Sequence, residues 1–200
     1  MRMSLIGIIL TFSLIDNIVL SRLLGICPCV GAPGGMRMTA ATSVATSLLM
    51  SLSALAAWAL ETFLLGPFGI EFLRIPLFVF SVACIAGLLD LAARRMVPQL
   101  LRAAGVPLAG IAFNCATLGV ALLVARASFT ALQSLVVGLA AGAGFFIALS
   151  LLTAIREKLE VEKVPSWLQG LPLHLISAGL LAYAFMAFDR AFLSRLLRGW

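Results

Sequence analysis

The chain has 200 residues, of which 62% are apolar and 11% are charged, and its net charge is +6. A soluble domain has about 45–50% apolar and about 25% charged residues, so this chain has too few polar side chains to cover a surface in water. The composition excludes a soluble domain and predicts a polytopic membrane protein in a lipid bilayer. With one Tyr and three Trp, the chain lacks an aromatic platform for bases, and no nucleic-acid partner is expected.

Six segments are apolar over the length of about 20 residues that a helix needs to cross a membrane. They cover approximately residues 4–24, 39–60, 75–92, 105–124, 130–152 and 171–188. The predicted fold is therefore all-α, with six transmembrane helices in a single membrane domain covering residues 1–200. Glycines in the fifth segment and small residues in the second favour close helix contact. The charged run at 156–163 predicts a solvated loop with a surface helix.

The distribution of basic residues predicts an orientation. The loops and span ends after spans one, three and five carry eight Lys and Arg, and the termini and the other two loops carry six. Because cytoplasmic loops carry the excess of Lys and Arg, both termini are expected outside the cytoplasm.

Polar residues at matching places hint at an internal repeat. They are Asn17 in span one with Asn114 in span four, and Asp90 at the end of span three with Asp189 at the end of span six. Two three-helix halves, about 1–95 and 100–195, would have opposite orientations, since three is an odd number. Inverted repeats of this kind tend to place a site at the midplane, between broken helices.

Two cysteine-containing segments could carry chemistry. In the first, Cys27-Pro28-Cys29 lies between Gly25 and Gly31, and Pro and Gly both predict that the helix breaks there. In the second, Asn114-Cys115 lies at the middle of span four. Thiolates select iron–sulfur clusters, zinc or copper(I), and a cluster normally takes four thiolates. One thiol in each half would make half a site, which a second chain could complete, whereas a lone membrane cysteine is often only a packing residue.

These residues carry a resemblance to a known family. The chain resembles the A-type subunits of the Rnf membrane electron-transfer complex, and is similar to the small membrane subunits of the sodium-translocating NADH:quinone oxidoreductase. The matching motifs run over nearly the whole chain: 16–20 (DNIVL), 23–28 (LLGICP), 114–123 (NCATLGVALL), 154–159 (AIREKL), 164–165 (VP), 178–180 (AGL) and 184–186 (AFM).

The resemblance implies six helices in two inverted three-helix repeats, broken near the midplane of a bacterial inner membrane. In such a membrane, the orientation predicted from the Lys and Arg counts places both termini in the periplasm. It implies a partner, a homologous E-type membrane subunit, and one 2Fe–2S cluster held by two cysteines from each chain. By motif, the ligands here are Cys27 and Cys115, with Cys29 as an alternative to Cys27. The cluster would relay electrons between other Rnf subunits that carry iron–sulfur clusters and flavins, within an ion-translocating ferredoxin:NAD oxidoreductase.

Two asparagines are candidates for residues that lie next to such a cluster without binding its iron. Asn17 and Asn114 could donate hydrogen bonds to a cluster sulfur. Asp16 and Asn17 are polar residues inside a span, and an ionisable residue there is a functional candidate by default. The alternative for this pair is a polar cap on a broken helix.

Two other function classes fit the same sequence. One is a permease for a small solute or ion, built on inverted repeats, with Asp16, Asn17 and Asn114 lining the path. The other is a cofactor-free subunit that docks larger partners. Iron content distinguishes the electron relay from both of these, and co-purification of partners distinguishes the docking subunit from the permease.

Overall fold

The computed structural model describes residues 5–15, 17–22, 24–25, 35–69, 71–96, 114–127, 129–161 and 170–186. Over these residues the chain is helical and contains no strand. The elements in chain order are α1 (Leu5–Leu10), the π-helix η1 (Thr11–Ile15), α2 (Ile18–Arg22), α4 (Met36–Leu60), the π-helix η2 (Glu61–Leu65), α5 (Gly66–Phe68), the 3₁₀ helix η3 (Glu71–Leu73), α6 (Arg74–Met96), α9 (Cys115–Arg126), α10 (Ala131–Val161) and α11 (Leu171–Met186).

The helices confirm an all-α polytopic membrane protein. Within the described residues, three helices are long and apolar enough, by length and composition, to cross a membrane: Met36–Leu65, Arg74–Arg95 and Ala131–Leu159. Two shorter apolar helices are Cys115–Arg126 and Leu171–Phe185. Residues 105–113 of the predicted fourth span lie outside the described residues.

Helix α10 is longer than the predicted fifth span. It continues without interruption to Val161, so the first part of the charged run is the end of this helix and not a loop. The physical reason is composition, because Ala, Arg, Glu, Lys and Leu are all good helix formers and neither Gly nor Pro occurs in 154–161.

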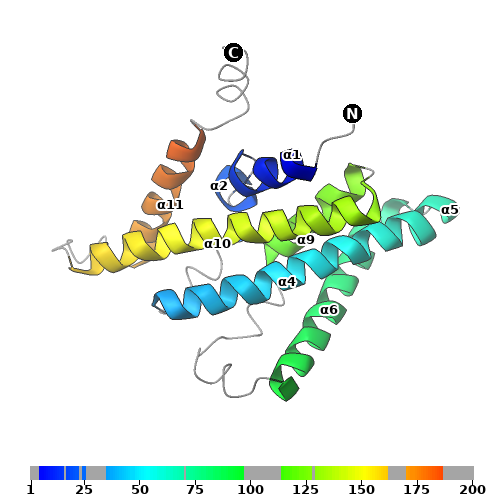
Figure 1. Ribbon diagram of the computed structural model, residues 1–200, viewed down its shortest axis with the longest axis horizontal. Helices are drawn as coiled ribbons and strands as arrows, with labels where there is room; N and C mark the ends of the chain where they lie inside the picture. Colours follow the sequence, from blue (N-terminus) through cyan, green and yellow to red (C-terminus); the bar gives the residue numbers. More distant parts are fainter. Residues whose placement is uncertain are drawn as a thin grey trace, which may run out of the picture.

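Helices α4 and α10 are the two longest helices that the structure describes, and they lie side by side (Figure 1). A Cβ atom added at Gly138 would lie 2.5 Å from the Cα of Ser51, and one added at Gly142 would lie 2.7 Å from the Cα of Ser47. The two glycines therefore let the backbones approach closely, as expected for helices packed in lipid. The small residues of these two spans thus have the packing role predicted for them.

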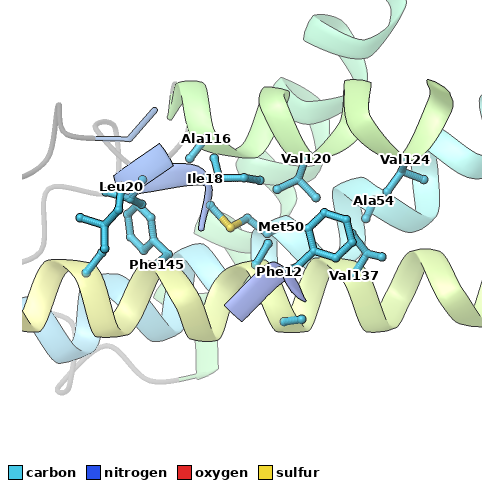
Figure 2. Close-up of a cluster of buried hydrophobic side chains, with 14 of the residues drawn as sticks. Phe12, Ile18, Leu20, Met50, Ala54, Ala116, Val120, Val124, Val137 and Phe145 are labelled. Carbon is cyan, nitrogen blue, oxygen red and sulfur yellow. The ribbon is translucent and has the colours of Figure 1, made fainter. Parts of the chain in front are cut away.

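The main core lies where this pair meets α9 and the N-terminal helices. Figure 2 shows side chains from four parts of the chain meeting there. They are Phe12, Ile18 and Leu20 from the first segment, Met50 and Ala54 from α4, Ala116, Val120 and Val124 from α9, and Val137 and Phe145 from α10. This core fixes the short helices α2 and α9 against the long pair.

Helices α6 and α11 leave the central pair in different directions (Figure 1). The start of α6 is held to the start of η2, which continues α4, by an ion pair. In this pair Arg74 donates from Nε to Oε2 of Glu61 over 3.2 Å and from Nη2 to Oε1 over 2.5 Å. Only 17% of the apolar stretch of α6 is buried inside the chain. Its remaining apolar surface suits lipid or another membrane subunit.

Candidate functional site

Asn17 marks the break in the first predicted span. Its side chain is 2% exposed, and its Oδ1 accepts a hydrogen bond of 3.0 Å from the backbone N–H of Val19, in the first turn of α2. Its Nδ2 donates to the carbonyl of Ser13 over 3.3 Å and to the carbonyl of Gly144 on α10 over 2.8 Å. Asn17 therefore caps α2 and also ties the broken helix to α10, which is the cap geometry given above as the alternative.

Asn114 has the same position relative to α9. It is 2% exposed, and its Oδ1 accepts a hydrogen bond of 3.1 Å from the backbone N–H of Ala116. Each asparagine thus accepts a bond from the residue two positions further on, at the start of a short helix. This equivalence agrees with an internal repeat, although the inverted arrangement of the two halves stays a prediction.

The two asparagines differ in one respect. The Nδ2 atom of Asn114 is buried and has no hydrogen-bond partner among the described residues, and the same holds for the hydroxyl of Thr117, in the first turn of α9. Buried polar groups nearly always have a partner, which can be a water or an ion. The first turn of α9 therefore has unused hydrogen-bonding capacity next to Cys115.

Cys115 is the first residue of α9, and it meets the end of the N-terminal segment. The backbone N–H of Gly25 donates to the Sγ of Cys115 over 3.0 Å. The turn at Gly25 is fixed in part by the N–H of Leu24, which donates to the carbonyl of Ile18 over 3.3 Å. Residues that are 90 positions apart in the sequence are thus joined at one sulfur atom.

Three predicted site residues, Cys27, Cys29 and Asp16, lie outside the described residues, as does Asp189 of the predicted repeat. The structure does describe the end of α2 at Arg22 and a turn at Leu24–Gly25, so the helix ends before the Cys27-Pro28-Cys29 segment. Cys84, on α6, is free and exposed.

The residues around Cys115 suit a sulfur ligand that carries negative charge. The start of a helix carries partial positive charge from its free N–H groups, and the Gly25 amide adds a donor at the sulfur. The unpartnered Asn114 amide lies in the neighbouring residue. Among the described residues, no group of three or more His, Cys, Asp or Glu side chains is placed to hold a metal ion.

Sequence reasoning does not single out Gly25 or Gly144 as contributors to this site. In the sequence pattern Gly25 only loosens the backbone, and Gly144 is only one of the small packing residues of its span. The available signal is the position of Gly25, two residues before a cysteine at the end of an apolar helix, where a left-handed turn is common.

Comparison with known proteins gives one consistent result. Residues 5–191 match the family model described as Rnf-Nqr subunit, membrane protein. The chain is 39% identical over 176 residues to an Edwardsiella ictaluri protein named as the A-type subunit of an ion-translocating oxidoreductase complex, covering 88% of this chain and 91% of the relative. A Serratia proteamaculans protein of the same name is 38% identical over 175 residues, with the same coverage of both chains. The chain belongs to the Rnf-Nqr family of membrane subunits.

Proposed function

We propose that this chain is a membrane subunit of an ion-translocating ferredoxin:NAD oxidoreductase complex of the Rnf type, in a bacterial inner membrane. In this proposal it relays electrons across the membrane through a 2Fe–2S cluster shared with a homologous E-type subunit. The names of its relatives, as A-type subunits of an ion-translocating oxidoreductase complex, support the assignment to such a complex. The observation that supports the cluster is the Cys115 sulfur at the start of α9, with the Gly25 amide directed at it.

The ligands proposed from this chain are Cys115 and Cys27, with Cys29 as the alternative to Cys27. Cys27 follows Gly25 by two residues, so the length of the chain keeps its Cα within about 7.6 Å of the Gly25 Cα. Because the Gly25 amide touches the Cys115 sulfur, a thiol two residues further along the chain is within reach of the same cluster as Cys115. The other two thiolates that a 2Fe–2S cluster requires would come from the partner subunit.

When bound, the cluster supplies outer-sphere transfer of one electron at a time, with no bond made or broken. Other residues of the chain hold the ligand cysteines in position. Asn114 starts α9 at the residue before Cys115, which directs the positive end of the helix at the sulfur. Asn17 ties α2 to α10 through Gly144, so the chain leading into Gly25 is anchored to the long helices.

The proposed partners follow from the same assignment. The homologous subunit would dock in the membrane, and the subunits with iron–sulfur clusters and flavins would exchange electrons on either side of it. With both termini in the periplasm, the loops after spans one, three and five would face the cytoplasm. Their excess of basic residues agrees with that orientation.

The test is an anaerobic purification of this chain with its homologous partner, followed by assays of iron, acid-labile sulfide and the reduced EPR spectrum. We expect about two irons and two sulfides per heterodimer, as a 2Fe–2S centre requires. Cys115→Ser should lose both. Cys84→Ser is the matched control, because Cys84 is a free thiol exposed on α6, and it should keep both.

Other outcomes would reject the ligand assignment or the relay function itself. Retention of the cluster in Cys115→Ser would reject Cys115 as a ligand. A comparison of Cys27→Ser with Cys29→Ser assigns the second ligand, since only one of the two should lose the iron. A colourless, well-folded wild-type pair would reject the relay function and leave the permease, tested by ion flux, or the docking subunit, tested by co-purification of partners.

A further inference from the structure

Gly25 is a buried residue in an unusual backbone conformation at the candidate site. Its φ is +93°, in the left-handed region that favours glycine. In this conformation its N–H points at the Cys115 sulfur, 3.0 Å away. The contact is made by the main chain, so no side chain of the first segment is needed for it.

Only glycine fits in this place. A Cβ atom at position 25 would lie 2.8 Å from Cε2 of Phe145 and 2.9 Å from Cβ of Ala116, and 3.3 Å from Oδ1 of Asn114. The residue is therefore pressed between α9 and α10. A larger residue would have to move out of this position, and its amide would move away from the Cys115 sulfur.

The surrounding contacts hold the amide in position from both sides. On one side, Asn17 caps α2 and bonds to Gly144, and the Leu24 N–H closes the turn onto Ile18. On the other side, Asn114 caps α9 and fixes the first turn that carries Cys115. The donor and the sulfur are thus each attached to a capped helix.

We propose that Gly25 is a positioning residue, whose backbone amide donates to the Cys115 sulfur and sets the reduction potential of the cluster bound there. This inference rests on the proposed function. In one cycle a reduced iron–sulfur or flavin donor gives up one electron, and an oxidised flavin or iron–sulfur acceptor takes it up on the other side. The added electron puts negative charge on the sulfurs, and an N–H donor stabilises that charge. The amide therefore raises the potential.

The first experiment tests the hydrogen bond without a cluster. The full chain is labelled with ¹⁵N-glycine, and the Gly25 amide signal is identified by its loss in Gly25→Ala. In Cys115→Ala the Gly25 proton should shift upfield and exchange with solvent faster, because its acceptor is gone. A Gly25 signal that does not respond to Cys115→Ala would overturn the inference, whatever the cluster does.

The second experiment uses the anaerobic heterodimer and compares Gly25→Ala with Gly87→Ala. The control has open space around position 87, with nothing within 4 Å of an added Cβ. We expect the midpoint potential from an EPR-monitored titration to fall in Gly25→Ala and to be unchanged in Gly87→Ala. In the ¹⁵N-glycine-labelled pair, pulsed EPR of the reduced state should show a nitrogen coupling that Gly25→Ala removes.

The two ways of failing are distinguishable. If the wild-type pair contains iron but Gly25→Ala keeps the wild-type potential and the nitrogen coupling, the role of Gly25 is rejected and the proposed function stands. If the wild-type pair contains no iron, the proposed function fails, and the role of Gly25 fails with it. If Gly25→Ala does not fold, the Gly25 signal is assigned instead by adding ¹³C-carbonyl leucine, which selects the Leu–Gly pairs 24–25, 65–66 and 118–119, with Gly66→Ala and Gly119→Ala identifying the other two. The response of the Gly25 signal to Cys115→Ala is then the readout.

Discussion

The two capping asparagines make a matched pair for a stability experiment. Asn17 and Asn114 are equally buried and each caps a short helix. Among the residues that the structure describes, only Asn17 also has a partner for its Nδ2, which donates to the carbonyl of Gly144 on another helix. Replacing each by Ala should therefore destabilise the chain by different amounts.

The expected magnitudes follow from the contacts. Loss of an N-cap costs about 1 kcal/mol, which both variants share. Asn17→Ala also removes a hydrogen bond between helices, which averages about 0.6 kcal/mol and reaches about 1.7 kcal/mol in membrane proteins. The expected total is about 2 kcal/mol for Asn17→Ala and about 1 kcal/mol for Asn114→Ala. For a chain of this size, the Tm falls by about 2–4 °C for each kcal/mol of unfolding free energy lost. The Tm should therefore fall by about 4–8 °C in Asn17→Ala and by about 2–4 °C in Asn114→Ala.

The assay is unfolding of the cluster-free chain in detergent, followed by circular dichroism against temperature or against added denaturing detergent. Asn17→Ser serves as an intermediate, because Ser keeps the capping oxygen but is too short to replace the amide at Gly144. It should recover about half of the loss. An equal loss of stability in Asn17→Ala and Asn114→Ala would refute the reasoning, since the bond to Gly144 would then contribute nothing.

Two further predictions concern the packing of the long helices. Gly142→Ala should destabilise the chain by about 1–3 kcal/mol, the usual cost of overpacking, because the added Cβ would lie 2.7 Å from the Cα of Ser47. In the same unfolding assay, the control Gly87→Ala should leave the stability unchanged or slightly higher. The ion pair of Glu61 with Arg74 should contribute about 1 kcal/mol, so Arg74→Met should lower the Tm by a few degrees and Glu61→Gln in that background should lower it little further. A full second loss in the double variant would show that the two side chains do not interact.

The sequence alone determined the class of the protein and the approximate positions of helices α4, α6, α10 and α11, but not the break at Asn17 or the extension of α10 to Val161. A chain with 62% apolar residues must bury its surface in lipid, and a backbone in lipid satisfies its hydrogen bonds by forming helices. Apolar stretches of about 20 residues located the three described helices that are long enough to cross a membrane. The residues of interest, Cys115, Asn17 and Asn114, were also visible in the sequence, because polar groups are conspicuous within apolar spans.

The tertiary structure decided which of these residues meet and what each one does. No local pattern indicates that the Gly25 amide reaches the Cys115 sulfur, because this contact joins positions 90 residues apart. The role of Asn17 depended in the same way on the carbonyl of Gly144, 127 positions away. Local preferences set where a helix begins and ends, but contacts between distant segments depend on how the helices pack. The packing of α9 and α10 around one glycine is what brings a main-chain donor to the sulfur.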